Sequence, residues 1–210
     1  MGLPVLILGE SGSGKTTALR NFEPGEVGVI GVVGKPLPFR SKLKVYNLNK
    51  TAKQKNTDRY KLLRTVIQKS QVNTIVIDDS QYLLSYESFD NAAIKGYDKF
   101  TNMAVHFKEL IEFCIDDLPD NKTVYFLHHT EVTDQGKIKI KTIGKMLDSQ
   151  LTVEGLFSIV LLCKAEKDVH KFITQNEGNT TAKSPMEMFD LEIDNDLKYV
   201  DTVIREYYGI

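Results

Sequence analysis

A short apolar run that leads directly into a glycine-rich turn constrains the fold of this chain more than any other feature. Residues 3–8 are apolar and have the character of a buried strand, residues 9–16 match the pattern G-x-x-x-x-G-K-[ST], and residues 17–20 can open a helix. A strand, such a turn and a helix in this order are typical of a parallel sheet flanked by helices. We therefore expect an α/β fold.

The glycine-rich turn also predicts chemistry, because glycines let backbone N–H groups approach phosphate oxygens closely. In this Walker A pattern Lys15, which we expect to be exposed on the loop, would reach the β- and γ-phosphates of ATP, and Thr16 would ligate Mg²⁺. ATP and Mg²⁺ are thus the expected cofactors. The nucleotide contacts would come from Gly9, Glu10, Ser11, Gly12, Ser13, Gly14, Lys15, Thr16 and Thr17. A surface turn before a helix is the alternative interpretation of the same residues.

A second apolar run, at residues 74–79, ends in two adjacent carboxylates. This pattern is typical of a Walker B strand, in which an acidic residue holds Mg²⁺ directly or through water. Asp78 is the predicted metal ligand. Asp79 stands where many P-loop ATPases have a glutamate that activates the attacking water, so it is the candidate base. The alternative is a helix cap, because aspartate is a favourable N-cap residue.

The composition predicts one domain that spans residues 1–210. Of the 210 residues, 41% are hydrophobic and 26% charged, as in an ordinary globular protein. Cys114 and Cys163 lie in separate apolar runs without metal or redox spacing, which favours reduced core thiols and a cytoplasmic location. The chain has no basic leader with a cleavage site and no apolar run of about 18 residues, so we expect no membrane partner.

The hydrophobic periodicity predicts the remaining elements. We expect strands at residues 26–33, 43–47, 124–129 and 156–163, an antiparallel hairpin partner at 171–175, and helices at 51–70, at 98–117 and from about 196. Because ligands of open α/β sheets bind at the carboxyl ends of strands, the end of the 124–129 strand should face the nucleotide. His129, rather than His128, is the expected sensor of the γ-phosphate. An ordinary histidine at a strand end fits the pattern equally well.

Charge is distributed unevenly along the chain, although the net charge is only −1. Residues 35–69 contain eleven Lys or Arg and one acid, whereas residues 187–206 contain seven acids and two basic residues. These blocks are compatible with a polyanionic partner, with head-to-tail contact between subunits, or with solvated helix faces. Residues 137–141 alternate lysine and isoleucine, which predicts a half-exposed basic strand or a sheet edge protected by lysines.

Six segments at characteristic separations carry a family resemblance: residues 9–16, 34–39, 77–82, 95–100, 172–176 and 182–185. Among them Pro-Leu-Pro-Phe at 36–39 and Ala-Lys-Ser-Pro at 182–185 are the narrowest signals. Across almost the whole chain, these segments resemble the RecA-like phage ATPases that promote single-strand annealing. This core-only type is called Sak-four and is also grouped as a phage nucleotide-binding AAA family.

The resemblance implies a RecA-like P-loop core with a mostly parallel sheet, flanking helices and a C-terminal antiparallel hairpin. It implies a DNA-stimulated ATPase that acts in phage DNA recombination in the host cytoplasm, as a ring or filament of identical subunits. Single-stranded DNA is the implied partner, and a single-strand-binding protein is a further candidate. The segments that carry DNA in RecA-like proteins correspond here to Lys95, Tyr97, Lys137, Lys139 and Lys141.

The resemblance also implies catalytic positions. RecA-like subunits lend a cation to the γ-phosphate of a neighbour, and Lys183 matches that position, which makes the catalytic candidates Lys15, Asp79, His129 and Lys183. One departure concerns the glutamate that RecA recombinases carry near the end of the second strand. This chain has Val32 and Val33 there, which puts efficient hydrolysis in question or moves the base to Asp79.

Two other functions compete with this interpretation. A small-molecule kinase is also a P-loop protein of about this size, but its lid usually supplies several arginines, and the five arginines of this chain do not cluster in sequence. A nucleotide-gated DNA-binding module with little turnover is favoured by the missing glutamate and opposed by the paired Asp78 and Asp79.

Overall fold

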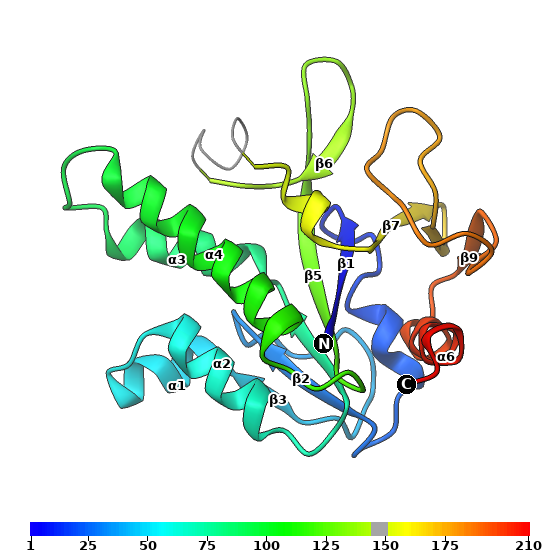
Figure 1. Ribbon diagram of the computed structural model, residues 1–210, viewed down its shortest axis with the longest axis horizontal. Helices are drawn as coiled ribbons and strands as arrows, with labels where there is room; N and C mark the ends of the chain where they lie inside the picture. The colour runs from blue at the N-terminus through cyan, green and yellow to red at the C-terminus, as the bar shows by residue number, and fades with distance from the viewer. Residues whose placement is uncertain (144–150) are drawn as a thin grey trace.

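The central sheet of the protein is mostly parallel, with helices on both faces (Figure 1). The computed structural model describes residues 1–143 and 151–210. Within these residues the strand order is β3-β2-β4-β5-β1-β7-β8-β9, and β6 pairs with β5 outside this path. The strands are β1 (Leu3–Gly9), β2 (Val27–Gly31), β3 (Val45–Asn47), β4 (Thr74–Asp78), β5 (Thr123–Val132), β6 (Ile138–Ile140), β7 (Ile159–Glu166), β8 (Val169–Ile173) and β9 (Glu192–Asp194).

Among the described residues, four helices cover one face of the sheet, and one α-helix with a short 3₁₀ helix covers the other (Figure 1). The first group is α1 (Leu48–Lys55), α2 (Arg59–Lys69), α3 (Gln81–Asp90) and α4 (Asp98–Asp116). The opposite face carries α6 (Leu197–Tyr208) and the short 3₁₀ helix η1 (Thr17–Asn21), and a second 3₁₀ helix, η2 (Val153–Leu156), precedes β7. The expected α/β class, the mostly parallel sheet and the C-terminal antiparallel hairpin of β7 and β8 are confirmed.

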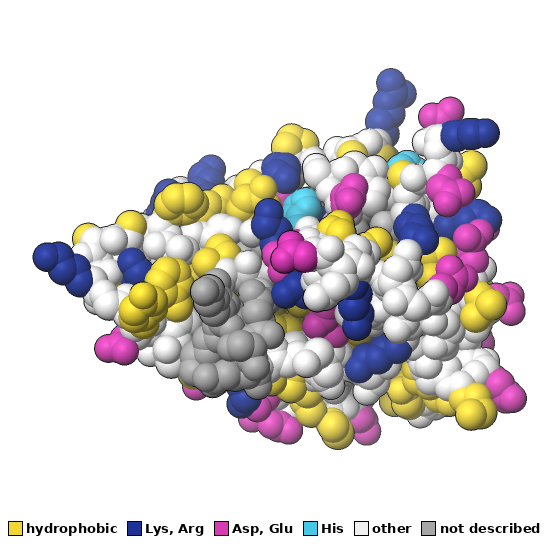
Figure 2. Space-filling view, turned by 90° about the horizontal axis from the view of Figure 1, so that it is seen from above, with side chains coloured by type: hydrophobic (Ala, Val, Ile, Leu, Met, Phe, Trp, Pro, Cys, Tyr) yellow, Lys and Arg dark blue, Asp and Glu magenta, His cyan; other side chains and the backbone are white. Residues whose placement is uncertain are grey.

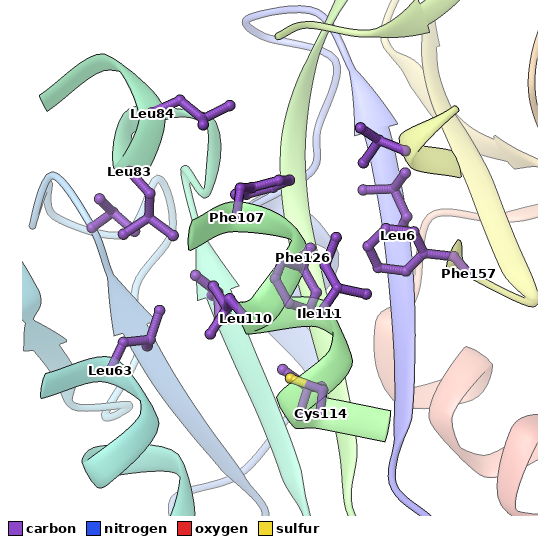
Figure 3. Packing of buried hydrophobic residues seen from close by; sticks show 14 of the residues in the cluster. Leu6, Leu63, Leu83, Leu84, Phe107, Leu110, Ile111, Cys114, Phe126 and Phe157 are labelled. Atoms are coloured by element: carbon purple, nitrogen blue, oxygen red, sulfur yellow. The ribbon is translucent and has the colours of Figure 1, made fainter. Parts of the chain in front are cut away.

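Alternation along the central strands divides the core into two layers. Leu6 and Leu8 of β1 join the larger cluster, and Val5 and Ile7 join the smaller one on the other face. Figure 3 shows the larger layer, in which side chains of α4 meet β1 and β5. A strand that is apolar on both faces must lie in the middle of a sheet. This placement brings the turn after β1 to the centre of the carboxyl edge.

Two expected helices differ from the structure. The helix expected at 51–70 is divided into α1 and α2, because Asn56 takes the left-handed conformation at the end of α1 and the side chain of Asp58 caps α2. The helix expected after residue 16 is only the five-residue η1, since Pro24 and Gly25 follow closely and favour a turn.

Candidate nucleotide site

A cavity of about 360 Å³ lies at the carboxyl edge of the sheet, where the turns after β1, β2 and β4 meet the upper part of β5. Strand β5 lies between β1 and β4 in the sheet, and its His129 is in register with Gly9 of β1. His129 therefore lies between the turn and the paired carboxylates. The lining residues are Ser11, Gly12, Gly14, Lys15, Thr16, Thr17, Lys35, Pro36, Pro38, Asp78, Asp79, His129 and His170.

Lys15 is buried within the turn, contrary to our expectation that it would be exposed. Its side chain is folded back, and Nζ donates hydrogen bonds to the carbonyl oxygens of Gly9 at 2.7 Å and Glu10 at 2.8 Å. The residue is only 7% exposed, and this burial lowers the pKa of its ammonium group, an effect that Cys163 and the nearby aspartates oppose. The turn therefore holds a desolvated cation at its centre.

Thr16 and Asp78 are brought together across the cavity. The hydroxyl of Thr16 donates a hydrogen bond of 2.9 Å to Oδ1 of Asp78. Burial and the adjacent Asp79 raise the pKa of Asp78, and the bond from Thr16 partly offsets this. A hydroxyl and a carboxylate at this separation are the hard oxygen donors that Mg²⁺ prefers, so the residues fit this ion.

The protein alone would supply only part of the coordination of Mg²⁺. Within residues 1–143 and 151–210, no group of three or more His, Cys, Asp or Glu side chains is arranged to hold a metal. Mg²⁺ in nucleotide sites usually keeps water and substrate phosphates among its ligands and takes one or two from protein side chains. The pair formed by Thr16 and Asp78 matches this mode.

Asp79 has an unusual backbone conformation and two basic neighbours. Its φ of 61° lies in the left-handed region, which costs a non-glycine residue about 1–3 kcal/mol and persists only where the surroundings enforce it. Its carboxylate lies 2.7 Å from Nζ of Lys35 and 3.4 Å from Nε2 of His129. Burial by itself would raise the pKa of Asp79, but the bonds from His129 and Lys35 outweigh it and lower that pKa. The carboxylate is therefore ionised at neutral pH.

The two adjacent histidines have different environments. His129 lines the cavity and contacts the ring of Tyr82 edge-on, whereas His128 is fully buried. Nδ1 of His128 lies 2.8 Å from the hydroxyl of Ser80, and its Nε2 lies 2.8 Å from the carbonyl oxygen of Lys141. Burial lowers the pKa of His128 to about 3, so the ring is neutral at physiological pH. Through these two bonds the ring links Ser80, the residue after Asp79, to Lys141 just after β6. The structure thus places His129 at the cavity.

The outer side of the turn is supported by residues that sequence reasoning missed. The carbonyl oxygen of Ser13 lies 2.8 Å from Nδ1 of His170 and accepts a hydrogen bond of 3.0 Å from the thiol of Cys163. A Cβ at Gly14, whose φ is 101°, would lie 2.8 Å from the ring of His170, so only glycine fits there. No motif points to His170. Cys163 was recognised only as a core thiol, and its side chain is indeed buried.

The DNA candidates lie on two separate extensions at the same edge. Lys95 and Tyr97 belong to the α3–α4 connection, where Tyr97 is 87% exposed, and the three lysines lie on and beside β6 (Figure 1). In the view from above, hydrophobic and basic side chains gather at the narrow end formed by α3 and α4 (Figure 2). Lys137 and Lys141 are exposed, whereas Lys139 is partly buried and pairs with Glu131 at 2.9 Å.

Lys183 does not join the cavity within its own chain. Its backbone forms an antiparallel bridge with Val160 of β7, with both hydrogen bonds at 2.8 Å. Val160 is level with Leu6 of β1, below the turn, and Lys183 is not among the described residues that line the cavity.

Of the helices described, none combines the length and the apolar character needed to cross a bilayer.

Comparison with known proteins adds no assignment to this geometry. A scan against protein-family models finds no match, and a search of curated proteins finds no relative of this chain.

Proposed function

We propose that this chain is a Mg²⁺-dependent P-loop ATPase that binds single-stranded DNA and promotes DNA recombination or strand annealing. The observation that carries the ATPase part is the pairing of Thr16 with Asp78 beside the buried ammonium of Lys15. These groups come from two strands that are not neighbours in the sheet. Hydroxyl, carboxylate and lysine in this arrangement suit the metal-bound β- and γ-phosphates of a nucleotide.

The residues around the cavity would divide the work of hydrolysis. Lys15 would neutralise charge on the β- and γ-phosphates, while Thr16 and Asp78 would hold Mg²⁺, which supplies electrostatic stabilisation of the phosphoryl group when bound. Asp79, whose lowered pKa makes it a weak base, would accept a hydrogen bond from the attacking water and orient it. His129 would contact the terminal phosphate from β5.

The DNA part of the proposal depends on the family resemblance and on the exposed groups at the same edge. Exposed lysines beside β6 and the exposed ring of Tyr97 provide phosphate contacts and a surface for base stacking. The backbone N–H of Lys141 donates a hydrogen bond of 2.9 Å to the carbonyl oxygen of His129, so the segment that carries these lysines is bonded to a residue of the cavity. The primary test measures ATP hydrolysis with and without single-stranded DNA, and we expect DNA to increase the rate.

The geometry disfavours the kinase alternative and keeps the gated module as the second candidate. No arginine is found among the described residues of the cavity, and Arg20, Arg59 and Arg205 each bond to groups elsewhere. The gated module is favoured by the engagement of Asp79 with both Lys35 and His129, which leaves its carboxylate occupied. Turnover that stays negligible with DNA and Mg²⁺ present would favour the module.

The two aspartates should have separable roles. Asp78→Asn should raise the Mg²⁺ concentration needed for nucleotide binding, because a neutral amide is a poorer ligand for a hard cation. Asp79→Asn should leave nucleotide affinity nearly unchanged. It should slow hydrolysis by about 10²-fold or more, because the attacking water is no longer oriented by a carboxylate. Titration with Mg²⁺ and single-turnover kinetics distinguish these effects. Equal loss of nucleotide affinity in both variants would refute the role given to Asp79.

Binding of single-stranded DNA should depend strongly on salt, because each phosphate neutralised by a lysine contributes about −0.7 to the log–log slope. Replacing Lys137, Lys139 and Lys141 together with alanine should flatten the slope by roughly one to two units, since Lys139 is already paired with Glu131. Fluorescence anisotropy at several salt concentrations measures this slope.

The matched control replaces Lys50, Lys53 and Lys55, three exposed lysines of α1 that lie within the basic segment of residues 35–69. It removes the same charge from a different surface. If the control flattens the slope and the β6 variant does not, the DNA path lies over α1 instead.

A further inference from the structure

Lys35 occupies a position in the cavity that no sequence motif predicts. Its Nζ lies 2.7 Å from Oδ2 of Asp79 and 5.5 Å from the centre of the Tyr82 ring. It lines the same cavity as Lys15 and Thr16 but approaches it from the segment after β2. The described lining of the cavity therefore includes one lysine inside the turn, Lys15, and another beside the paired carboxylates, Lys35.

The segment that carries Lys35 is held firmly against the Walker B strand. The backbone N–H of Val32 donates a hydrogen bond of 3.0 Å to the carbonyl oxygen of Asp78. Gly34 has a φ of 79°, and a Cβ there would lie 1.8 Å from the amide nitrogen of Asn47, so a side chain is excluded. Pro36 and a second proline at 38 further restrict the backbone that follows. These contacts restrain the backbone that carries Lys35, whereas its ammonium group is held only by the exposed ion pair with Asp79.

The ion pair between Lys35 and Asp79 is placed so that the Lys35 ammonium can leave the carboxylate for a phosphate group. The Lys35 side chain is 56% exposed and that of Asp79 is 13% exposed, so the ammonium can leave the carboxylate without entering a less solvated place. The terminal phosphate of a nucleoside triphosphate carries more negative charge than a carboxylate and attracts the ammonium more strongly at the same distance. A diphosphate bound in the turn would end nearer Lys15 and leave the ion pair in place.

We propose that Lys35 is a second phosphate-binding lysine, which moves from Asp79 to the terminal phosphate of a nucleoside triphosphate and so distinguishes ATP from ADP. This inference rests on the proposed nucleotide site. Its consequence is that the Asp79 carboxylate becomes available to a water molecule only when a terminal phosphate is present. The ion pair thereby couples readiness for hydrolysis to the identity of the bound nucleotide.

The test compares affinities for ADP and for the non-hydrolysable triphosphate analogue AMP-PNP, each with Mg²⁺, by titration calorimetry. Lys35→Ala should weaken AMP-PNP binding by about ten- to a hundredfold, the range of a charge-assisted hydrogen bond, and leave ADP binding nearly unchanged. Lys35→Arg should retain most of the preference. Lys42→Ala, which removes an exposed lysine of the same segment outside the described cavity lining, should behave as the unaltered protein.

The same titrations in an Asp79→Asn background separate phosphate binding from charge balance. If Lys35 contacts the phosphate, adding Lys35→Ala to Asp79→Asn still weakens AMP-PNP binding selectively. If Lys35 only neutralises Asp79, the added loss disappears, and the inference is wrong. Equal losses for ADP and AMP-PNP in Lys35→Ala, or no loss, would also overturn it. If the unaltered protein binds neither nucleotide, the proposed function fails as well, so the two failures are distinguishable.

Discussion

Replacing Lys15 with alanine should abolish detectable ATP hydrolysis, with a loss of at least about 10²-fold in kcat/KM. The ammonium group is buried at the centre of the turn, where desolvation strengthens its attraction for phosphate oxygens. No other described lysine lies inside the turn. Lys35 also lines the cavity, but it comes from the segment after β2 and does not replace the ammonium group of Lys15 within the turn. Release of inorganic phosphate and direct nucleotide binding measure the effect.

Burial of Lys15 means that its loss should also affect stability. The variant loses two hydrogen bonds to carbonyl groups, at a cost of about 1–3 kcal/mol. Lys122 provides a matched control, because it is 5% exposed and donates to the carbonyl oxygens of Ser70 and Val72 at 2.8 and 3.0 Å. Lys122→Ala should lower the thermal midpoint comparably and leave hydrolysis intact. A Lys15→Ala protein that hydrolyses ATP normally would refute the assignment of the turn.

Loss of Lys183 should reduce hydrolysis by about 10³- to 10⁵-fold, the contribution of a cation supplied in trans to the transition state when arginine plays this role. Because Lys183 lies beside β7 and outside the described lining of the cavity, we propose that it acts on the nucleotide of a neighbouring subunit. Lys183→Ala should therefore bind ATP with nearly normal affinity and hydrolyse it slowly. Lys183→Arg should restore much of the rate.

Mixing experiments test whether Lys183 acts between subunits. Lys15→Ala subunits keep Lys183 but lack a working turn, and Lys183→Ala subunits have the reverse defect. Mixed assemblies should regain activity at those interfaces where a normal turn faces a normal Lys183. The proposal is contradicted by a protein that is monomeric with ATP and DNA present and yet fully active.

Local sequence patterns were sufficient for most of the fold. The apolar runs at 3–8, 74–78 and 124–129 gave the central strands, since a strand that is buried on both faces needs apolar residues at successive positions. The ends of elements were less predictable. The boundary between α1 and α2 depends on Asn56 in the left-handed conformation, and β9 is a three-residue edge strand with no periodicity of its own.

The residues of the site were predictable where they form a local motif, but the burial of their side chains was not. The residues of the turn and the paired aspartates are each recognisable because their spacing is local, and the structure brings Thr16 within hydrogen-bond distance of Asp78, 62 residues away. The exposure of Lys15 was judged wrongly. A charged side chain on a loop is usually solvated, and only the packing of the turn against its own carbonyl groups shows that this one is buried.

The sequence by itself determined that a strand enters a glycine-rich turn and that carboxylates end a second strand, because both properties depend on residues adjacent in the chain. Only the tertiary structure decided which other groups meet them. Lys35 reaches Asp79 because β2 and β4 are neighbours in the sheet, and His170 reaches Ser13, 157 residues away, because β8 pairs with β7. Such contacts follow from strand order, which arises from packing two apolar layers around one sheet and is not written in any local pattern.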